Sequence, residues 1–327
     1  MSLALAVAYG AAVALPFIAP LFALILTAAP GPPMGAKRLL VLTLVVMITL
    51  GVGLLLIPLL INYPVTGFLV VAVGIYFSNY LTVNLSKGGF AILLTMGITL
   101  ISAAGTLSYP LAVEVIQALV IGVTIATLCQ WLVYPLFPED EVTASPAAAP
   151  TGAAQNNWIA LRATIVVLPV YFVVLTNPAA YLPIIMKSVS LGQQASEVHA
   201  RHAGRELLGS TFMGGCLAIV FWFALGIEVS LWMFFLWMLL FMIFLSSRLY
   251  QLVESRWPPS FWQNAIVTML ILLGSAVQDS ATGKDVYKAF AVRMGLFIAV
   301  TIYAWGAVFY LEVLRNGLAN RSTVRTA

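Results

Sequence analysis

The sequence predicts an all-α polytopic membrane protein, and three observations support that prediction. Of its 327 residues, 62% are hydrophobic. Charged residues make up only 8% of the chain, against roughly 25% in soluble domains. Long charge-free intervals recur, and an apolar stretch of about 20 residues is what a helix needs to cross the hydrocarbon of a bilayer. A water-soluble fold of this size has too little interior to hide so many apolar side chains.

The charge-free intervals predict about twelve transmembrane segments, six on each side of a polar stretch. In the first half they are residues 3–15, 17–29, 39–61, 67–81, 90–107 and 111–136. The first two are either two short spans separated at Pro16 or one long span kinked there, because proline removes a helical hydrogen bond. In the second half the intervals are residues 158–176, 178–190, 207–227, 231–247, 261–277 and 290–311.

The polar stretch divides the chain. Residues 138–157 begin with acidic side chains and continue with a run rich in Ala, Pro, Ser and Gly, a composition typical of a solvated linker. We therefore expect a first membrane repeat at residues 1–137, a cytoplasmic linker at 138–157, a second membrane repeat at 158–316, and a cytoplasmic C-terminal tail at 317–327.

Loop charges predict the orientation, since Lys and Arg in short loops stay on the cytoplasmic side. With a cytoplasmic N-terminus, ten of them fall in cytoplasmic segments: Lys37, Arg38, Lys87, Arg201, Arg205, Arg248, Arg256, Arg315, Arg321 and Arg325. Only Lys284 and Lys288 then fall outside. We expect both termini in the cytoplasm.

The two halves resemble each other weakly but in a constant order. Residues 16–20 match 178–183, 37–43 match 205–211, 95–103 match 268–276, and Trp131 matches Trp305. The offset between matched positions drifts slowly in one direction, as small loop insertions in a duplicated unit would cause. Since each half has an even number of segments, the two copies would enter the membrane in the same sense, as a parallel repeat. The prolines of each second segment are either structural kinks or the flanks of a central cavity.

Few side chains could perform catalysis. The two histidines, His199 and His202, lie in one predicted cytoplasmic stretch without a nearby Cys, so we expect no metal site and no nucleophile with a base at hand. No Gly-Lys-Ser/Thr phosphate loop occurs, and no basic run suits a nucleic acid. We therefore expect neither an enzyme nor a cofactor, and no nucleic-acid partner.

Several motifs resemble one family. Residues 205–215, RELLGSTFMGG, resemble the Arg-x-x-Gly-Thr-x-x-Gly signature of the fusaric acid resistance and aromatic acid exporter (FUSC-like) superfamily. Residues 293–306 look like the final membrane segment of that superfamily, and residues 15–33 look like the start of a compact branch of bacterial inner-membrane proteins of unknown function. The similarity extends over nearly the whole chain. The chain departs from the pattern in spelling the central pair Gly209-Ser210-Thr211 and in lacking a large cytoplasmic domain.

The resemblance implies a proton-driven efflux component in a bacterial inner membrane. It also implies a periplasmic adaptor of the membrane-fusion type as a possible partner. Small residues such as Gly51, Gly53, Gly214 and Gly215 permit close helix approach, either within one protomer or in a homo-oligomer.

Three cations within predicted spans are candidates for binding an organic anion, because a charge near the bilayer centre costs at least about 2.5–3.5 kcal/mol and needs a partner or a purpose. They are Arg162, Lys187 and Arg293. Arg162 and Lys187 could instead snorkel to the interface. Arg293 could instead pair structurally with Asp285, Asp279 or a backbone carbonyl.

Carboxylates at the outer ends of spans are candidates for proton coupling, which needs an acid that changes charge in a partly desolvated place. Glu114 is the first candidate and Asp279 the second, with Glu228 as a further alternative. At such positions an ordinary hydrated carboxylate is the competing interpretation.

Aromatic and amide side chains could hold a flat amphipathic ligand by stacking and hydrogen bonding. Tyr181 lies between the two prolines of its segment, and Trp262 and Asn264 lie on one predicted span together with Gln263 and Gln278. The competing interpretation is the usual interfacial belt of Trp and Tyr.

Two hypotheses of function follow. The first is a secondary transporter that exports small aromatic or amphipathic organic anions against protons. The second is a non-transporting scaffold for a periplasmic adaptor or a lipid-linked assembly. A lipid-modifying enzyme is disfavoured because no acid-base set is clustered in the sequence.

Overall fold

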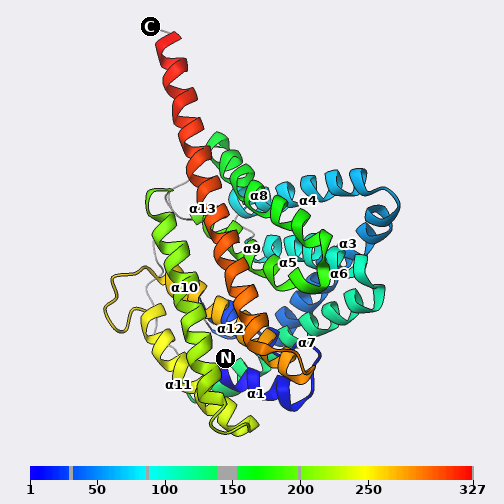
Figure 1. The fold of residues 1–327 in the computed structure, drawn as a ribbon, viewed down its shortest axis with the longest axis vertical. Coiled ribbons are helices and arrows are strands. Elements are labelled where there is room, and N and C mark those ends of the chain that lie inside the picture. Colours follow the sequence, from blue (N-terminus) through cyan, green and yellow to red (C-terminus); the bar gives the residue numbers. More distant parts are fainter. Residues whose placement is uncertain (29–31, 86–87, 138–152, 198–199, 326–327) are drawn as a thin grey trace.

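The computed structural model describes residues 1–28, 32–85, 88–137, 153–197 and 200–325 (Figure 1). Within these ranges the chain forms helices joined by short turns and contains no strand. Nine of the described helices are long and apolar enough to cross a membrane. The predicted class, an all-α polytopic membrane protein, is confirmed at this level.

The helix bounds lie within a few residues of the predicted intervals for most segments. The first half contains α1 (Ser2–Gly10), α2 (Ile18–Thr27), α3 (Ala36–Asn62), α4 (Pro64–Leu85), α5 (Gly88–Met96), the π-helical segment η1 (Gly97–Ile101), α6 (Ser102–Leu107) and α7 (Tyr109–Val133). The second half contains α8 (Ala153–Thr176), α9 (Pro178–Glu197), α10 (Ala200–Leu225), α11 (Leu231–Leu249), α12 (Pro259–Ala281) and α13 (Val286–Arg325). The segments α5, η1 and α6 follow one another without a break.

The N-terminal segment forms two short helices rather than one kinked span. Residues 11–17 separate α1 from α2, and within them Ala12 has a φ of 50°, a left-handed conformation that turns the chain. Pro16 lies in this turn. Pro20 lies in the first turn of α2, where its missing N–H costs no helical hydrogen bond.

Other boundaries differ from the sequence-based prediction. The helix α9 continues without a break through Pro183 to Glu197. The helical structure is interrupted before α9, at Asn177. Of the predicted linker, residues 138–152 lie outside the described residues and 153–157 belong to α8. The predicted tail continues α13 as far as Arg325, and this end projects beyond the other helices in Figure 1. His199 lies outside the described residues.

Many large apolar side chains point outward, as lipid-facing helices require. On α3, α4 and α11 they include Leu40, Leu44, Ile48, Leu55, Val65, Leu69, Val73, Trp232, Leu240 and Ile243. Such a surface is unfavourable in water but is solvated by acyl chains. Most of the buried apolar residues form one cluster that runs through both halves, and a second, small cluster lies in the second half.

Helices of the first half pack against helices of the second half. The helix α4 of the first half packs against α8 of the second, α1 packs against α11, and α9 packs against α5 and α6. Side chains also cross the boundary: Asn79 Nδ2 donates to Thr164 Oγ1 at 3.1 Å, and the hydroxyls of Ser102 and Tyr171 lie 2.8 Å apart. The halves therefore fold as one interlocked bundle.

Glycines permit the closest helix crossings. A Cβ at Gly53 would overlap the Gly97 carbonyl oxygen, which joins α3 to η1, whereas a Cβ at Gly51 would meet nothing within 4 Å. In the second half a Cβ at Gly214 of α10 would lie 2.5 Å from the Ala265 carbonyl oxygen of α12. A Cβ at Gly215 would meet the Met294 side chain of α13. Gly53, Gly214 and Gly215 thus act in packing within the protomer, while Gly51 does not.

Candidate functional site

A cavity of about 510 Å³ with polar lining residues lies between the halves, and we call it the seam cavity. It is lined by the turn before α2, by η1 and α7 of the first half, and by α9, α12 and α13 of the second. Four ionisable residues face it: Glu114, Asp279, Lys284 and Arg293. Three of them are candidates from the sequence, which the fold thus brings together from α7, α12 and α13.

Two of these four charges neutralise each other. Arg293 donates to both carboxylate oxygens of Asp279, with Nη2 at 3.1 Å from Oδ1. The Asp279 side chain is only 5% exposed, so this bidentate pair is largely shielded from water. The structural pairing foreseen as an alternative for Arg293 is confirmed. Glu114 is exposed to the cavity.

A second cavity, of about 500 Å³, lies against α2, α3, α5 and α7. Its walls are apolar and include Phe22, Leu26 and Phe90. The charged residues that line it, Lys37 and Arg38, stand in the first turn of α3, where unpaired backbone N–H groups add positive potential. We call it the basic cavity. From the sequence, these two cations predict only the orientation of the chain.

A smaller cavity of about 120 Å³ lies between the other two. This middle cavity shares Phe22, Ile25 and Ile92 with the basic cavity and shares Ile18 and Met186 with the seam cavity. The short helix α2 lines all three cavities. The three cavities therefore form a row along the helix that follows the Pro16 turn.

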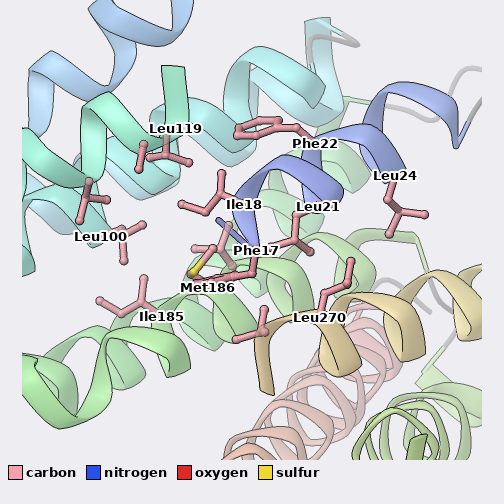
Figure 2. Packing of buried hydrophobic residues seen from close by; sticks show 14 of the residues in the cluster. Phe17, Ile18, Leu21, Phe22, Leu24, Leu100, Leu119, Ile185, Met186 and Leu270 are labelled. Atoms are coloured by element: carbon pink, nitrogen blue, oxygen red, sulfur yellow. The ribbon is translucent and has the colours of Figure 1, made fainter. Parts of the chain in front are cut away.

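Apolar side chains close the row between the cavities. Figure 2 shows α2 between the helices of the first half and helices α9 and α12 of the second, with Ile18, Leu21 and Phe22 pointing outward from α2. Ile18 and Phe17 are at most 5% exposed, and Met186 of α9 is 8% exposed. In this conformation the row is interrupted by packed side chains.

A buried polar cluster lies beside the middle cavity. Lys187 of α9 is fully buried, and its Nζ donates to Asn264 Oδ1 and to Thr268 Oγ1 of α12, each at 2.8 Å. Asn264 Nδ2 in turn lies 2.5 Å from Ser210 Oγ of α10. Lys187 and Asn264, predicted separately from the sequence, are thus direct partners. Snorkelling does not describe Lys187, because its side chain is fully buried and its amine donates to two residues of α12.

Arg162 lies in a different place. Its Nη1 donates to Glu312 Oε1 of α13 at 2.7 Å, and its side chain is 6% exposed. This ion pair ties α8 to α13. Glu312 was not among the residues foreseen, because it follows directly after the predicted end of the last span.

The two aromatic candidates pack into the structure. Trp262 is 6% exposed, donates from Nε1 to Ser255 Oγ at 2.9 Å, and contacts Phe244 and Phe261 edge to face. Tyr181 is half-buried and packs against the apolar core. The residues missed by sequence reasoning are Ser210, Thr268 and Glu312. Ser210 lies within the family signature and Thr268 within the repeat match, so the sequence contained a signal for both residues.

Part of the chain matches a known family. The family described as "Protein of unknown function (DUF2955)" matches residues 1–133, which span α1 to α7. No curated protein and no solved structure matches the chain. All lining residues of the basic cavity fall within the matched part, so this likeness includes the basic cavity and α2.

Proposed function

We propose that this protein is a secondary transporter that exports small aromatic or amphipathic organic anions in exchange for protons. The observation that supports it best is the row of three cavities along α2, with openings of about 500 Å³ and 510 Å³ at its two ends. Volumes of this size hold small organic molecules. The closed middle segment keeps the two openings separate, which is compatible with alternating access to the two sides of the membrane.

The charges at the two ends favour outward movement of an anion. The basic cavity offers Lys37 and Arg38 beside apolar walls, which suits a carboxylate attached to an aromatic or aliphatic body. At the seam cavity, two carboxylates balance two cations. By the loop charges, the basic cavity faces the cytoplasm. An organic anion would thus be attracted on the cytoplasmic side and held less strongly on the other.

At the seam cavity the departing anion would meet Arg293. Its guanidinium is held by Asp279 in this conformation, so a substrate carboxylate would have to compete with that aspartate. Such competition releases the anion readily, because the ion pair re-forms behind it. Glu114 on the opposite wall would repel the anion toward solvent. Tyr181, Trp262 and Arg162 would support the site through packing rather than by touching the substrate.

We further propose that the halves, residues 1–137 and 158–316, are parallel repeats of six segments each. The helix contacts support this, because contacts in the first half have counterparts in the second half. The contact of α3 with η1 corresponds to that of α10 with α12, and the contact of α2 with α7 corresponds to that of α9 with α13. The contact of α1 with α11 has its counterpart in that of α8 with α4. A near-twofold relation of this kind would place the cavities close to the pseudo-symmetry axis.

The likeness to FUSC-like exporters suggests the setting. We propose the bacterial inner membrane as the location, with both termini in the cytoplasm, and a periplasmic membrane-fusion adaptor as a partner. The broad apolar faces of α3 and α4 would contact lipid or a second copy of the chain. A scaffold without transport is the alternative that the following experiment separates from export.

The test is transport by the purified chain in proteoliposomes. Benzoate, salicylate and 2-naphthoate are loaded inside, and their exit is followed with and without an opposing proton gradient. We expect at least one compound to move faster when the gradient is present. If none moves in either condition, the exporter proposal is wrong and the scaffold alternative gains.

Substitutions of Lys37 and Arg38 then test whether the basic cavity attracts the substrate anion. Lys37→Gln and Arg38→Gln should each raise the substrate concentration needed for half-maximal export, because they remove a cation from the basic cavity. Lys288→Gln is the matched control, since Lys288 is an exposed cation on the opposite side. Equal effects of all three substitutions would contradict the role of the basic cavity.

A further inference from the structure

The Lys187 amine differs from the other buried cations of the described chain in its partners. Its two hydrogen-bond acceptors, Asn264 Oδ1 and Thr268 Oγ1, belong to neutral side chains. Lys187 and Thr268 are fully buried, and Asn264 is 1% exposed. By contrast, Arg162 and Arg293 each contact a carboxylate. No carboxylate of a described residue forms an ion pair with Lys187.

The partners of Lys187 are fixed by their own hydrogen bonds. Asn264 directs its Nδ2 toward Ser210 Oγ, so its Oδ1 is left to accept from the lysine. Thr268 donates its hydroxyl proton to the Asn264 carbonyl oxygen at 2.7 Å and can therefore only accept from Nζ. The cluster thus presents two oriented acceptors to the amine. It joins α9, α10 and α12.

Titratable groups on the helices packed against α9 are engaged elsewhere or face outward. The segments α5, η1 and α6 contain none. On α8, α12 and α13 the groups with described side chains are Arg162 with Glu312, Asp279 with Arg293, Tyr171 with Ser102, Tyr303 with the Ile165 carbonyl, Arg315 over Trp158, and the exposed Tyr287, Lys288 and Tyr310. On α10, which joins the cluster through Ser210, Arg205 is exposed, Cys216 is half-buried, and the Glu206 carboxylate accepts from Ser260 Oγ. On α9 itself Tyr181 is half-buried. No opposite charge among the described residues therefore offsets a proton on Lys187.

An uncompensated ammonium is costly in such surroundings, whereas a neutral amine can donate both hydrogen bonds without that cost. The packed cluster therefore suits the amine without its extra proton. Protonation calls for water at Nζ, which the buried cluster admits only if α9 and α12 separate. The charge of one side chain is thereby linked to the arrangement of α9 against α12.

The same two helices form the wall of the middle cavity. Met186 precedes Lys187 and lines both the middle and the seam cavity, while Gln263 and Val267 precede Asn264 and Thr268 and line the middle cavity. A movement of α9 against α12 at the cluster would shift the residues that close the row. The cluster is placed to convert a protonation event into opening of the path.

We propose that the Lys187 amine is the site where the coupling proton binds, in place of Glu114 and Asp279. This inference rests on the proposed transport function. In the cycle, the amine takes one proton from the outer solution to become the ammonium, and the ammonium returns that proton to the cytoplasm. The substrate-loaded chain moves with the neutral amine and with α9 packed on α12. The empty chain returns with the ammonium and with these two helices apart, so that water reaches Nζ, and one proton enters as one substrate leaves.

The decisive variant is Lys187→Met in proteoliposomes, compared with Lys288→Met as the matched control. We expect Lys187→Met to lose gradient-driven export of the compound that the wild type moves, while exchange of labelled for unlabelled compound without a gradient continues. Retained gradient-driven export would overturn the proposal and leave the transporter intact. Loss of both activities in a folded variant would instead assign Lys187 to substrate binding. Wild-type protein that moves nothing would count against the transport function itself.

A spectroscopic measurement decides the proton site without transport. The chain has five lysines, Lys37, Lys87, Lys187, Lys284 and Lys288, so the ε-¹⁵N resonance of Lys187 can be identified by its loss in Lys187→Met or, should that variant not fold, in Lys187→Gln. We expect this resonance to change between its amine and ammonium positions across the pH range of the assay. A resonance that keeps one charge state throughout that range overturns the proposal.

Discussion

The two halves of the protein satisfy their buried polar groups in different ways. Among the described residues, the first half buries only neutral polar side chains, including Thr49, Ser78, Asn79, Thr95, Thr99 and Ser102. The second half buries Arg162, Lys187 and Asp279 as well. In the first half a hydroxyl such as Ser78 Oγ lies 2.7 Å from Thr95 Oγ1 and needs no counter-charge. In the second half, the buried Arg162 and the half-buried Arg293 each have a carboxylate partner.

This difference separates two tasks that one membrane protein must combine. Hydroxyl pairs and close glycine contacts hold helices together at little desolvation cost, so the first half is suited to shaping a path. Buried charges cost several kcal/mol unless paired, and their arrangement can change when a proton or an anion arrives. The second half therefore holds the groups able to respond to ligands. The family match covers residues 1–133, so it describes the first half.

Breaking the buried ion pair of the second half should give the largest effect on stability. Asp279→Ala leaves the Arg293 guanidinium, 17% exposed, without its partner. We expect a loss of about 3–5 kcal/mol in the free energy of unfolding, the range measured when one member of a buried pair is removed. Denaturant unfolding of the purified protein in detergent measures it.

The double variant Asp279→Ala/Arg293→Met is the control for that substitution. Because it removes both charges, most of the lost stability should return. If Asp279→Ala alone costs less than about 1 kcal/mol, the pair behaves as a surface salt bridge, and the contrast drawn between the halves weakens.

The first half should instead be most sensitive to added volume. Gly53→Ala forces a methyl group into the Gly97 carbonyl oxygen, and overpacking of this kind typically costs about 1–3 kcal/mol. Gly51→Ala, two residues earlier on the same helix, meets nothing within 4 Å and should be neutral or slightly stabilising, since alanine favours helix over glycine. Unfolding in detergent compares the two. Equal destabilisation by both would show that the α3 to η1 crossing is not set by Gly53.

The positions of the helices could be predicted because charge-free intervals have a direct physical meaning in a bilayer. Residues 111–136 were expected as a span, and α7 covers Tyr109–Val133. The π-helical turn η1 could not be foreseen, because the composition of residues 97–101 does not separate a π register from an α register. The turn lies where Gly97 closely approaches the backbone of α3 at Thr49.

Many residues of the candidate site were foreseen, but of their contacts only the pairing of Arg293 with Asp279 was. Lys187 and Asn264 were each selected for being polar within a span, while their 2.8 Å contact depends on how α9 packs against α12. Arg162 pairs with Glu312, which lies 150 residues away in the sequence. The basic cavity was missed because Lys37 and Arg38 follow the usual pattern of cytoplasmic loop charges, and only the fold places apolar walls beside them.

A hydrogen bond between the halves should give a smaller effect. Tyr171→Phe removes the hydroxyl that lies 2.8 Å from Ser102 Oγ, while Ser102 keeps its bond to the Ile98 carbonyl. We expect a loss of about 0.5–1.5 kcal/mol, typical of one neutral hydrogen bond. Tyr310→Phe, at an exposed position of α13, is the matched control and should change little. A loss above about 3 kcal/mol would mean that Tyr171 has a further role.

The smallest effect is expected at the exposed carboxylate of the seam cavity. Glu114→Gln and Asp279→Asn make the same carboxylate-to-amide change on opposite walls of that cavity. Glu114 is exposed and forms no ion pair with a described residue. Its substitution should therefore alter the free energy of unfolding by less than about 0.5 kcal/mol. Asp279→Asn, by contrast, should weaken the ion pair with Arg293 and destabilise the protein more. Unfolding of both variants at neutral pH provides the comparison. A destabilisation by Glu114→Gln as large as that by Asp279→Asn would reveal a buried partner for Glu114, and the first half would then hold a structural charge of its own.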